Sequence, residues 1–199
     1  YDANLQMYGS VNLREKHLEE MVWTNEGRYF TPYAQKLLRQ RGPPPPESDW
    51  PEYRQRLIEL MALYNSGGEN LLAVETDEPV YTLLLPGFAY HRELLALTYA
   101  GLPNHIVLKA ATLNGAKALG LGDSLGSLEV NKLADLIIVN GNPLADIKHT
   151  RNIHRVITQG VVHNPKTLLK FAQGKIGPQD GNDRAQWILE IPPLRTAVK

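Results

Sequence analysis

The sequence contains no cysteine, and this absence excludes several kinds of chemistry at once. A disulfide scaffold, a thiol nucleophile, an iron–sulfur cluster and a cysteine-built zinc site all require that residue. A metal ion in this chain would therefore need histidine, aspartate or glutamate ligands. The sequence also lacks an excess of either charge, since 21 basic and 21 acidic side chains cancel. This balance gives no electrostatic reason to expect a nucleic acid or an anionic membrane as a partner.

Two further absences concern the membrane and the start of the chain. No apolar run approaches the ~20 residues that span a bilayer. The first residues, 1–4, do not resemble the start of a signal peptide, and the chain does not begin with methionine. We therefore expect the chain to be part of a longer protein, and its localisation is unknown.

None of the six histidines stands in an H-x-H, H-x-x-x-H or H-E-x-x-H spacing, the spacings typical of metal sites. His91 and Glu93 form an H-x-E pair like half of a zinc deaminase site, but that chemistry also requires cysteines. His91 opens a helical segment shortly after a predicted strand, which makes it a candidate substrate-binding residue. The other five are expected to be surface or structural histidines.

Hydrophobic periodicity predicts several helices and a few short strands. The helices are expected at 12–24, 33–41, 51–67, 90–100, 104–119 and 165–173, and the extended segments at 28–31, 71–74, 134–139 and 153–163, the last as a hairpin that turns at 159–160. Asn104 is the expected cap of one helix, and Gly120 is expected to end it. Residues 42–46, rich in proline, are expected to form a surface loop.

Asp77 is the most suggestive single residue. It follows the apolar run Leu71–Val74, which lacks alternation and so predicts a strand buried on both faces. Polar residues at the carboxyl end of such a strand lie where α/β folds place their chemistry. A carboxylate there suits a metal ion or a proton transfer, and an Asx turn or a helix cap is the structural alternative.

Gly122 to Gly126 match the G-x-S-x-G pattern of the serine nucleophile elbow, and Gly-Asp-Ser-Leu is similar to the signature of GDSL esterases. The elbow requires a strand before the serine and a helix after it. The predicted order here is the reverse, so a serine esterase is a remote alternative and a glycine-rich connection is favoured.

Four segments in order resemble the C-terminal part of metal-dependent amidohydrolases, in particular imidazolonepropionase-like and prolidase-like enzymes. They are 71–77, 91–97, 110–121 and 125–144. The last contains G-S-L-E-V-N-K-L-A-D-L, similar to the family pattern G-S-[IL]-E-x-G-K-x-A-D-L. Two residues depart from the family. Glu75 replaces a usual glycine before Thr76-Asp77, and Asn131 replaces the glycine of E-x-G-K, a mild change because asparagine tolerates the left-handed conformation.

The resemblance implies an α/β fold, the C-terminal portion of a TIM-like (β/α)8 barrel plus part of a small β-sandwich. We assign residues 1–122 to the last β/α units with the helices that follow, 123–165 to the partial sandwich, and 166–199 to a C-terminal tail packing on the rest. Asp77 would be a metal ligand, with zinc as the expected metal, and also the catalytic base that takes a proton from water activated by the metal.

The family's first-strand H-x-H and its other metal ligands have no counterpart in this sequence. We therefore expect a fragment of a hydrolase that cleaves C–N bonds in amide, peptide-like or cyclic amide substrates, inactive as an isolated chain. The alternative is a non-catalytic partial-barrel protein that acts through oligomerisation or a partner chain. Either way, exposed barrel and sandwich edges predict self-association or pairing with a missing N-terminal segment.

Overall fold

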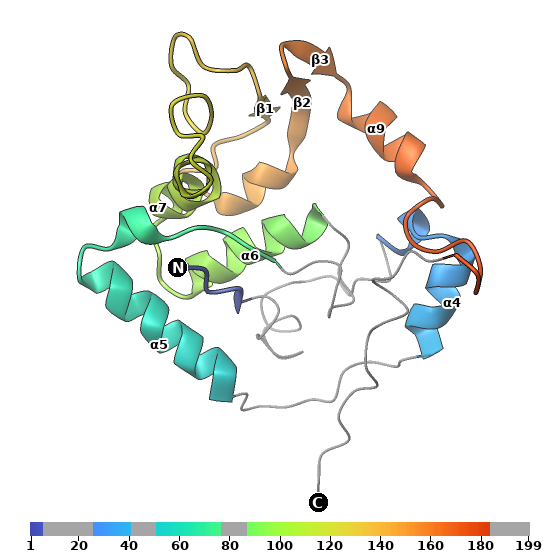
Figure 1. The fold of residues 1–199 in the computed structure, drawn as a ribbon, viewed down its shortest axis with the longest axis horizontal. Coiled ribbons are helices and arrows are strands. Elements are labelled where there is room, and N and C mark those ends of the chain that lie inside the picture. The colour runs from blue at the N-terminus through green and yellow to red at the C-terminus, as the bar shows by residue number, and fades with distance from the viewer. Residues whose placement is uncertain (6–25, 41–50, 77–86, 184–199) are drawn as a thin grey trace, which may run out of the picture.

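The computed structural model describes residues 1–5, 26–40, 51–76 and 87–183 (Figure 1). The helix expected over 12–24, the proline-rich loop at 42–46 and Asp77 lie outside the described residues. The described helices, 3-10 turns and strands are η1 (Gly27–Tyr29), α4 (Pro32–Gln40), α5 (Pro51–Asn65), η2 (Glu69–Leu71), α6 (Phe88–Tyr99), α7 (Asn104–Lys109), the π-helical turn η3 (Ala110–Asn114), α8 (Gly115–Ala118), β1 (Leu136–Val139), η4 (Ile147–Arg151), β2 (Ile153–Thr158), β3 (Val161–His163) and α9 (Pro165–Ala172). None of these described helices is long and apolar enough to cross a membrane.

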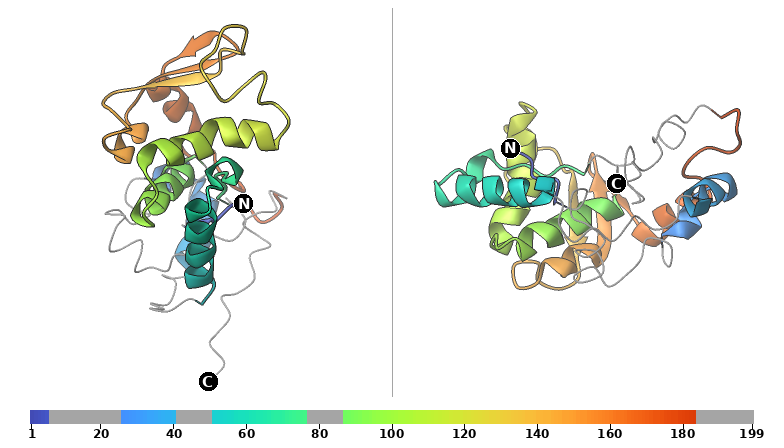
Figure 2. Two further views of the ribbon diagram at one scale, coloured as in Figure 1. Left: turned by 90° about the vertical axis from the view of Figure 1, so that its left-hand side faces the viewer. Right: turned by 90° about the horizontal axis from the view of Figure 1, so that it is seen from below.

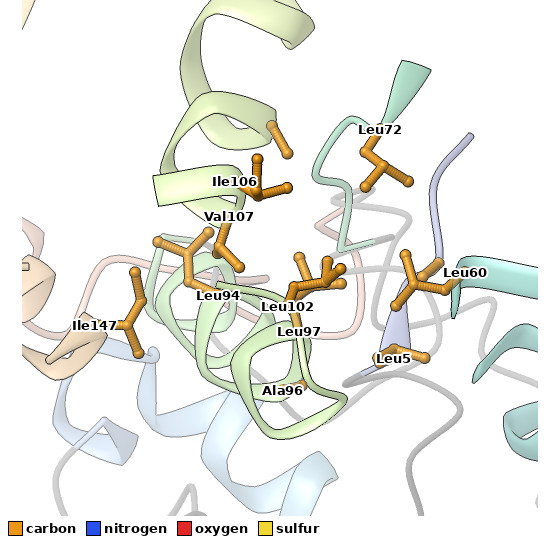
Figure 3. Packing of buried hydrophobic residues seen from close by; sticks show 12 residues of the cluster. Leu5, Leu60, Leu72, Leu94, Ala96, Leu97, Leu102, Ile106, Val107 and Ile147 are labelled. Atoms are coloured by element: carbon orange, nitrogen blue, oxygen red, sulfur yellow. The ribbon is translucent and has the colours of Figure 1, made fainter. Parts of the chain in front are cut away.

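The buried core lies where α6 and α7 meet α5 and the segments around residues 5 and 72 (Figure 3). Leucine dominates it, and the 3.6-residue spacing of the apolar positions explains why these helices bury one face. The cluster consists of Ala3, Leu5, Leu60, Leu72, Leu94, Ala96, Leu97, Leu102, Ile106, Val107, Ala110 and Ile147. The helices predicted at 51–67 and 90–100 are confirmed as α5 and α6.

The helix predicted over 104–119 is present, but its start and its interior differ from the prediction. Pro103, with extended dihedral angles, occupies the N-cap position, and Asn104 is the first helical residue. The Asn104 side chain instead donates a hydrogen bond to the Leu144 carbonyl. The stretch α7–η3–α8 also contains a π-helical turn that the periodicity did not predict. Gly120, with φ of +72°, ends the helical stretch as expected.

The strand predicted at 71–74 is wrong for most of its length. Leu71 closes the 3-10 turn η2 and is 65% exposed, and Leu72 alone is buried in the core. Ala73 forms an isolated parallel bridge with Asp2, in which the Ala73 N–H donates to the Tyr1 carbonyl over 3.0 Å. An apolar run reports burial but does not fix backbone conformation, and the hydrogen bond from the Leu71 N–H to the Gly68 carbonyl keeps this segment turned.

The extended segment predicted at 28–31 is also mostly a turn. Residues 27–29 form η1, and only Phe30 bridges another segment, at Ile176. The Thr31 N–H donates to the Ile176 carbonyl over 2.9 Å, and the Thr31 hydroxyl donates to the Pro178 carbonyl. Residues 174–178 thus run along residues 28–31, at the start of α4.

Three antiparallel strands form one sheet in the order β1-β2-β3, and it lies above α6 and α7 in Figure 1 and in the left view of Figure 2. The hairpin predicted to turn at 159–160 is confirmed. Gln159 and Gly160 have φ of +51° and +79°, as a two-residue type I′ turn requires, and the Asp135 carboxylate accepts a hydrogen bond from the Gln159 N–H. Ile137 and Ile138, which alternate between the two faces, are 48% and 44% exposed.

Candidate functional site

The N-terminal half of α6 gathers the charged and titratable side chains that the core buries most deeply. Arg92 forms a bidentate ion pair with Glu26, with Nη2 to Oε1 at 2.5 Å and Nη1 to Oε2 at 2.9 Å. The two side chains are 6% and 1% exposed. A buried charge requires a partner of this geometry, because losing water costs several kcal/mol per ion. The pair therefore connects α6 to the turn that precedes η1.

The neighbouring Glu93 connects α6 to a different segment. It is 1% exposed, and its Oε1 accepts a hydrogen bond from the Leu5 N–H over 2.9 Å. Burial, followed by the negative charge of Glu93, raises the pKa of Tyr53 on α5. Arg92 and Glu93 together hold segments from residues 5 and 26 against the same helix.

His91 directly precedes Arg92 and Glu93 in α6, and its side chain faces η4. Its Nδ1 is 3.1 Å from the Thr150 Oγ1, and the Thr150 hydroxyl donates to the Ile147 carbonyl over 2.8 Å. The single proton of the Thr150 hydroxyl is used in the bond to Ile147. The proton of the His91–Thr150 hydrogen bond is therefore assigned to His91 Nδ1, which donates to the Thr150 oxygen. The Nε2 atom of neutral His91 is then a hydrogen-bond acceptor.

Burial, together with the positive charges of Arg151 and Arg92, lowers the pKa of His91 to about 4. The side chain is therefore neutral at pH 7. A neutral imidazole with Nε2 as its acceptor suits a hydrogen bond from a substrate N–H or O–H.

This lowered pKa predicts that the chain loses stability as the pH falls from about 6.5 towards 4. The unfolded state binds the proton first, so folding is penalised below the unfolded pKa of histidine. A shift to about 4 corresponds to roughly 2 kcal/mol of lost unfolding free energy between pH 7.5 and pH 5.

Urea denaturation at pH 7.5 and at pH 5 measures this loss of unfolding free energy. Between the two pH values, His91→Gln should lose roughly 2 kcal/mol less unfolding free energy than the wild-type chain. His154→Gln, which replaces an exposed histidine of β2, should lose as much as the wild type. Equal losses in all three chains would contradict the burial of His91.

Asp77, the predicted metal ligand and base, lies outside the described residues. Across residues 1–5, 26–40, 51–76 and 87–183, no group of three or more histidine, aspartate or glutamate side chains is placed to hold a metal ion. The described residues alone therefore do not supply a metal centre.

The stretch with the G-x-S-x-G pattern does not form a nucleophile elbow. It follows the helical stretch that ends at Ala118, and residues 119–127 form turns and bends without a strand. Gly126 has φ of +88° and packs closely against the helical turn η3, because an added Cβ would lie 2.7 Å from the Leu113 Cα. Lys132 organises the loop through hydrogen bonds from Nζ to the Gly122 carbonyl and the Ser127 hydroxyl. Asn131 has φ of +73°, so the left-handed conformation expected at this position is confirmed.

Sequence reasoning missed the Arg92–Glu26 pair and the role of Glu93. The sequence offers one weak signal. Arg92 and Glu93 are charged residues directly before Leu94, in a helical segment that is expected to bury one face. The partners, 66 and 88 residues away, are not predictable from local pattern.

Comparison with known proteins matches residues 87–163 to the model of the amidohydrolase family. A 5-methylthioadenosine/S-adenosylhomocysteine deaminase of Teredinibacter turnerae is 38% identical over 89 residues, which are 45% of this chain and 17% of the deaminase. An imidazolonepropionase of Syntrophobacter fumaroxidans is 38% identical over 85 residues, 40% of this chain and 20% of that enzyme.

Among solved structures, an Xaa-Pro dipeptidase with bound methionine superposes with a TM-score of 0.50 and 26% identity. The superposition covers 66% of this chain and 32% of the dipeptidase. The matches to the curated relatives span only about a fifth of those relatives' length. The resemblance expected from the sequence is confirmed: residues 87–163 match the model of the amidohydrolase family.

Proposed function

We propose that this chain supplies the C-terminal part of a metal-dependent hydrolase that cleaves C–N bonds. The observation that carries the proposal is the amidohydrolase match over 87–163, a span that contains His91, Arg92, Glu93 and Thr150. The relatives are named as a deaminase, an imidazolonepropionase and a dipeptidase, which supports small amide, peptide-like or cyclic amide substrates for this chain as well.

In this proposal, residues 1–122 belong to the last β/α units of a barrel, 123–165 to a small sandwich and 166–199 to a tail. Two observations support the division. The bridge between Asp2 and Ala73 is parallel, as neighbouring barrel strands are, and the sheet β1-β2-β3 is antiparallel, as in a sandwich.

The proposed roles of the site residues follow from their chemistry. Asp77 is a metal ligand and the base that accepts a proton from the attacking water, because an ionised carboxylate is suited to both. His91 contacts the substrate through Nε2, since Nδ1 is held by Thr150. Zinc is the proposed metal, and the remaining ligands would come from residues outside this chain.

A non-catalytic role through association is the second candidate, and one observation favours it. Large apolar side chains are exposed on the sheet and on α9 within the described residues: Ile137, Ile138, Val161, Val162, Leu168, Leu169 and Phe171. We propose that the isolated chain self-associates through strands of 134–163 unless a missing N-terminal segment covers them.

The activity of the purified chain tests the proposal. We expect no amide hydrolysis with added zinc, because Asp77 is the one ligand proposed in this chain and catalytic zinc requires three or four. The measurement is turnover of dipeptide and cyclic amide substrates, with and without zinc. Metal-dependent turnover that Asp77→Asn abolishes would show that the chain is a complete catalyst and overturn the proposed division.

A further inference from the structure

Asn114 is a buried polar residue to which neither the sequence patterns nor the comparisons assign a role. It closes the π-helical turn η3 and is 3% exposed. Its Nδ2 donates two hydrogen bonds, to the Glu69 carbonyl over 2.8 Å and to the Leu72 carbonyl over 2.9 Å. The side chain thus uses both amide protons to bind the backbone of one short segment, η2 and the residue that follows it.

The orientation of this amide is fixed by its partners. Among the described residues, Asn114 Oδ1 has no hydrogen-bond partner, although it is buried. Rotating the amide by 180° would direct that oxygen at two carbonyl oxygens and lose both bonds. Burying an unpaired acceptor such as Oδ1 costs ~1–3 kcal/mol of folding stability. The two hydrogen bonds that Nδ2 donates offset this cost at Asn114.

A second side chain, which is half-buried, also holds the π-helical turn. Tyr90 on α6 donates from its hydroxyl to the Ala111 carbonyl over 2.9 Å. A π-turn changes the helical register locally, and such turns occur often at functional sites. Tyr90 therefore binds the turn that Asn114 closes, and this hydrogen bond does not involve the backbone of residues 69–72.

We propose that Asn114 is a positioning residue that fixes the backbone of residues 69–72, five residues ahead of Asp77 in the sequence. The proposal rests on the catalytic role proposed for Asp77. Asn114 touches neither substrate nor metal and acts through the chain that leads to the carboxylate. Lys109 supports the same segment from outside, with its Nζ 2.6 Å from the Asn70 Oδ1.

Amide hydrogen exchange of the full chain tests the first half of the proposal without any activity. Asn114→Leu, nearly equal in size, removes both donors, and Tyr90→Phe is the matched control because it removes one bond to the same turn. We expect Asn114→Leu to speed exchange at the Leu72 and Ala73 amides about tenfold more than at the α6 amides. Tyr90→Phe should change both groups by the same factor. Should Asn114→Leu unfold the chain, Asn114→Ser, which leaves a single donor, takes its place with a smaller expected ratio. Equal factors for the Asn114 variant would overturn the proposal.

Kinetics of the longer protein test the second half. A displacement of ~1 Å at a catalytic group costs on the order of 100-fold in rate, so Asn114→Leu should lower kcat about 10-fold to 100-fold with KM nearly unchanged. Tyr90→Phe should leave kcat unchanged while it lowers the thermal midpoint. Selective exchange without a fall in kcat would overturn the positioning role. A wild-type protein without hydrolase activity would instead overturn the proposed function, and the exchange ratio would still decide whether Asn114 fixes the 69–72 backbone.

Discussion

Replacing Asp77 by asparagine is expected to lower kcat of the longer protein by at least ~100-fold, the loss typical of a missing acid or base. Asparagine keeps the shape of the side chain but removes its charge and basicity. The measurement is the steady-state rate on the preferred amide substrate at saturating concentration, together with the metal content of each preparation.

Asp135→Asn is the matched control for this change. Asp135 is exposed and its carboxylate accepts a hydrogen bond from the Gln159 N–H, a bond that an asparagine oxygen preserves. We expect its kcat to stay within a few-fold of the wild type. An Asp77→Asn protein that is equally active would remove Asp77 from the mechanism.

Arg92→Met is expected to destabilise the full chain by ~3–5 kcal/mol, because it leaves the carboxylate of Glu26 buried without its counter-charge. Methionine fills a similar volume, so the loss reflects the uncompensated charge and not a cavity. Equilibrium denaturation in urea at pH 7 measures the change.

Two further variants separate this charge effect from general damage. The double variant Arg92→Met with Glu26→Leu removes both charges and should recover most of the lost stability. Glu129 forms an ion pair with Lys132, and its side chain is 61% exposed. Glu129→Gln should therefore change the unfolding free energy little by comparison. A double variant no more stable than Arg92→Met alone would contradict the role of the buried charge.

The described helices and the hairpin could be predicted from the sequence because their signals are local. The spacing of Leu57, Leu60 and Tyr64 gives α5 directly, and the Gln159–Gly160 turn gives the hairpin. The segment at 71–74 could not be predicted, because Leu72 is buried in the core cluster while the 3-10 turn η2 before it sets the backbone conformation. Apolar character alone does not distinguish these two causes.

The roles of His91 and Asp77 stay predictions. The sequence indicates His91 because it lies near the start of a helical segment, but its partner Thr150 is 59 positions away and has no local signal. The ion pair of Arg92 and the two bonds of Asn114 are likewise long-range, and no periodicity predicts which carboxylate or carbonyl a buried donor meets. Resemblance to amidohydrolases supplied what local pattern could not, the role expected of Asp77.

The central claim, that this chain completes a metal-dependent C–N hydrolase, is tested most directly by the metal dependence of the longer protein. The protein is purified, treated with a chelator, dialysed, and assayed on Xaa-Pro dipeptides, cyclic amides and aminopurine nucleosides before and after zinc is added. The account predicts hydrolysis of at least one of these classes, loss of that activity on chelation and its return with zinc. Hydrolysis that chelation leaves unchanged, or no hydrolysis of any class by a folded, zinc-loaded protein, would contradict it.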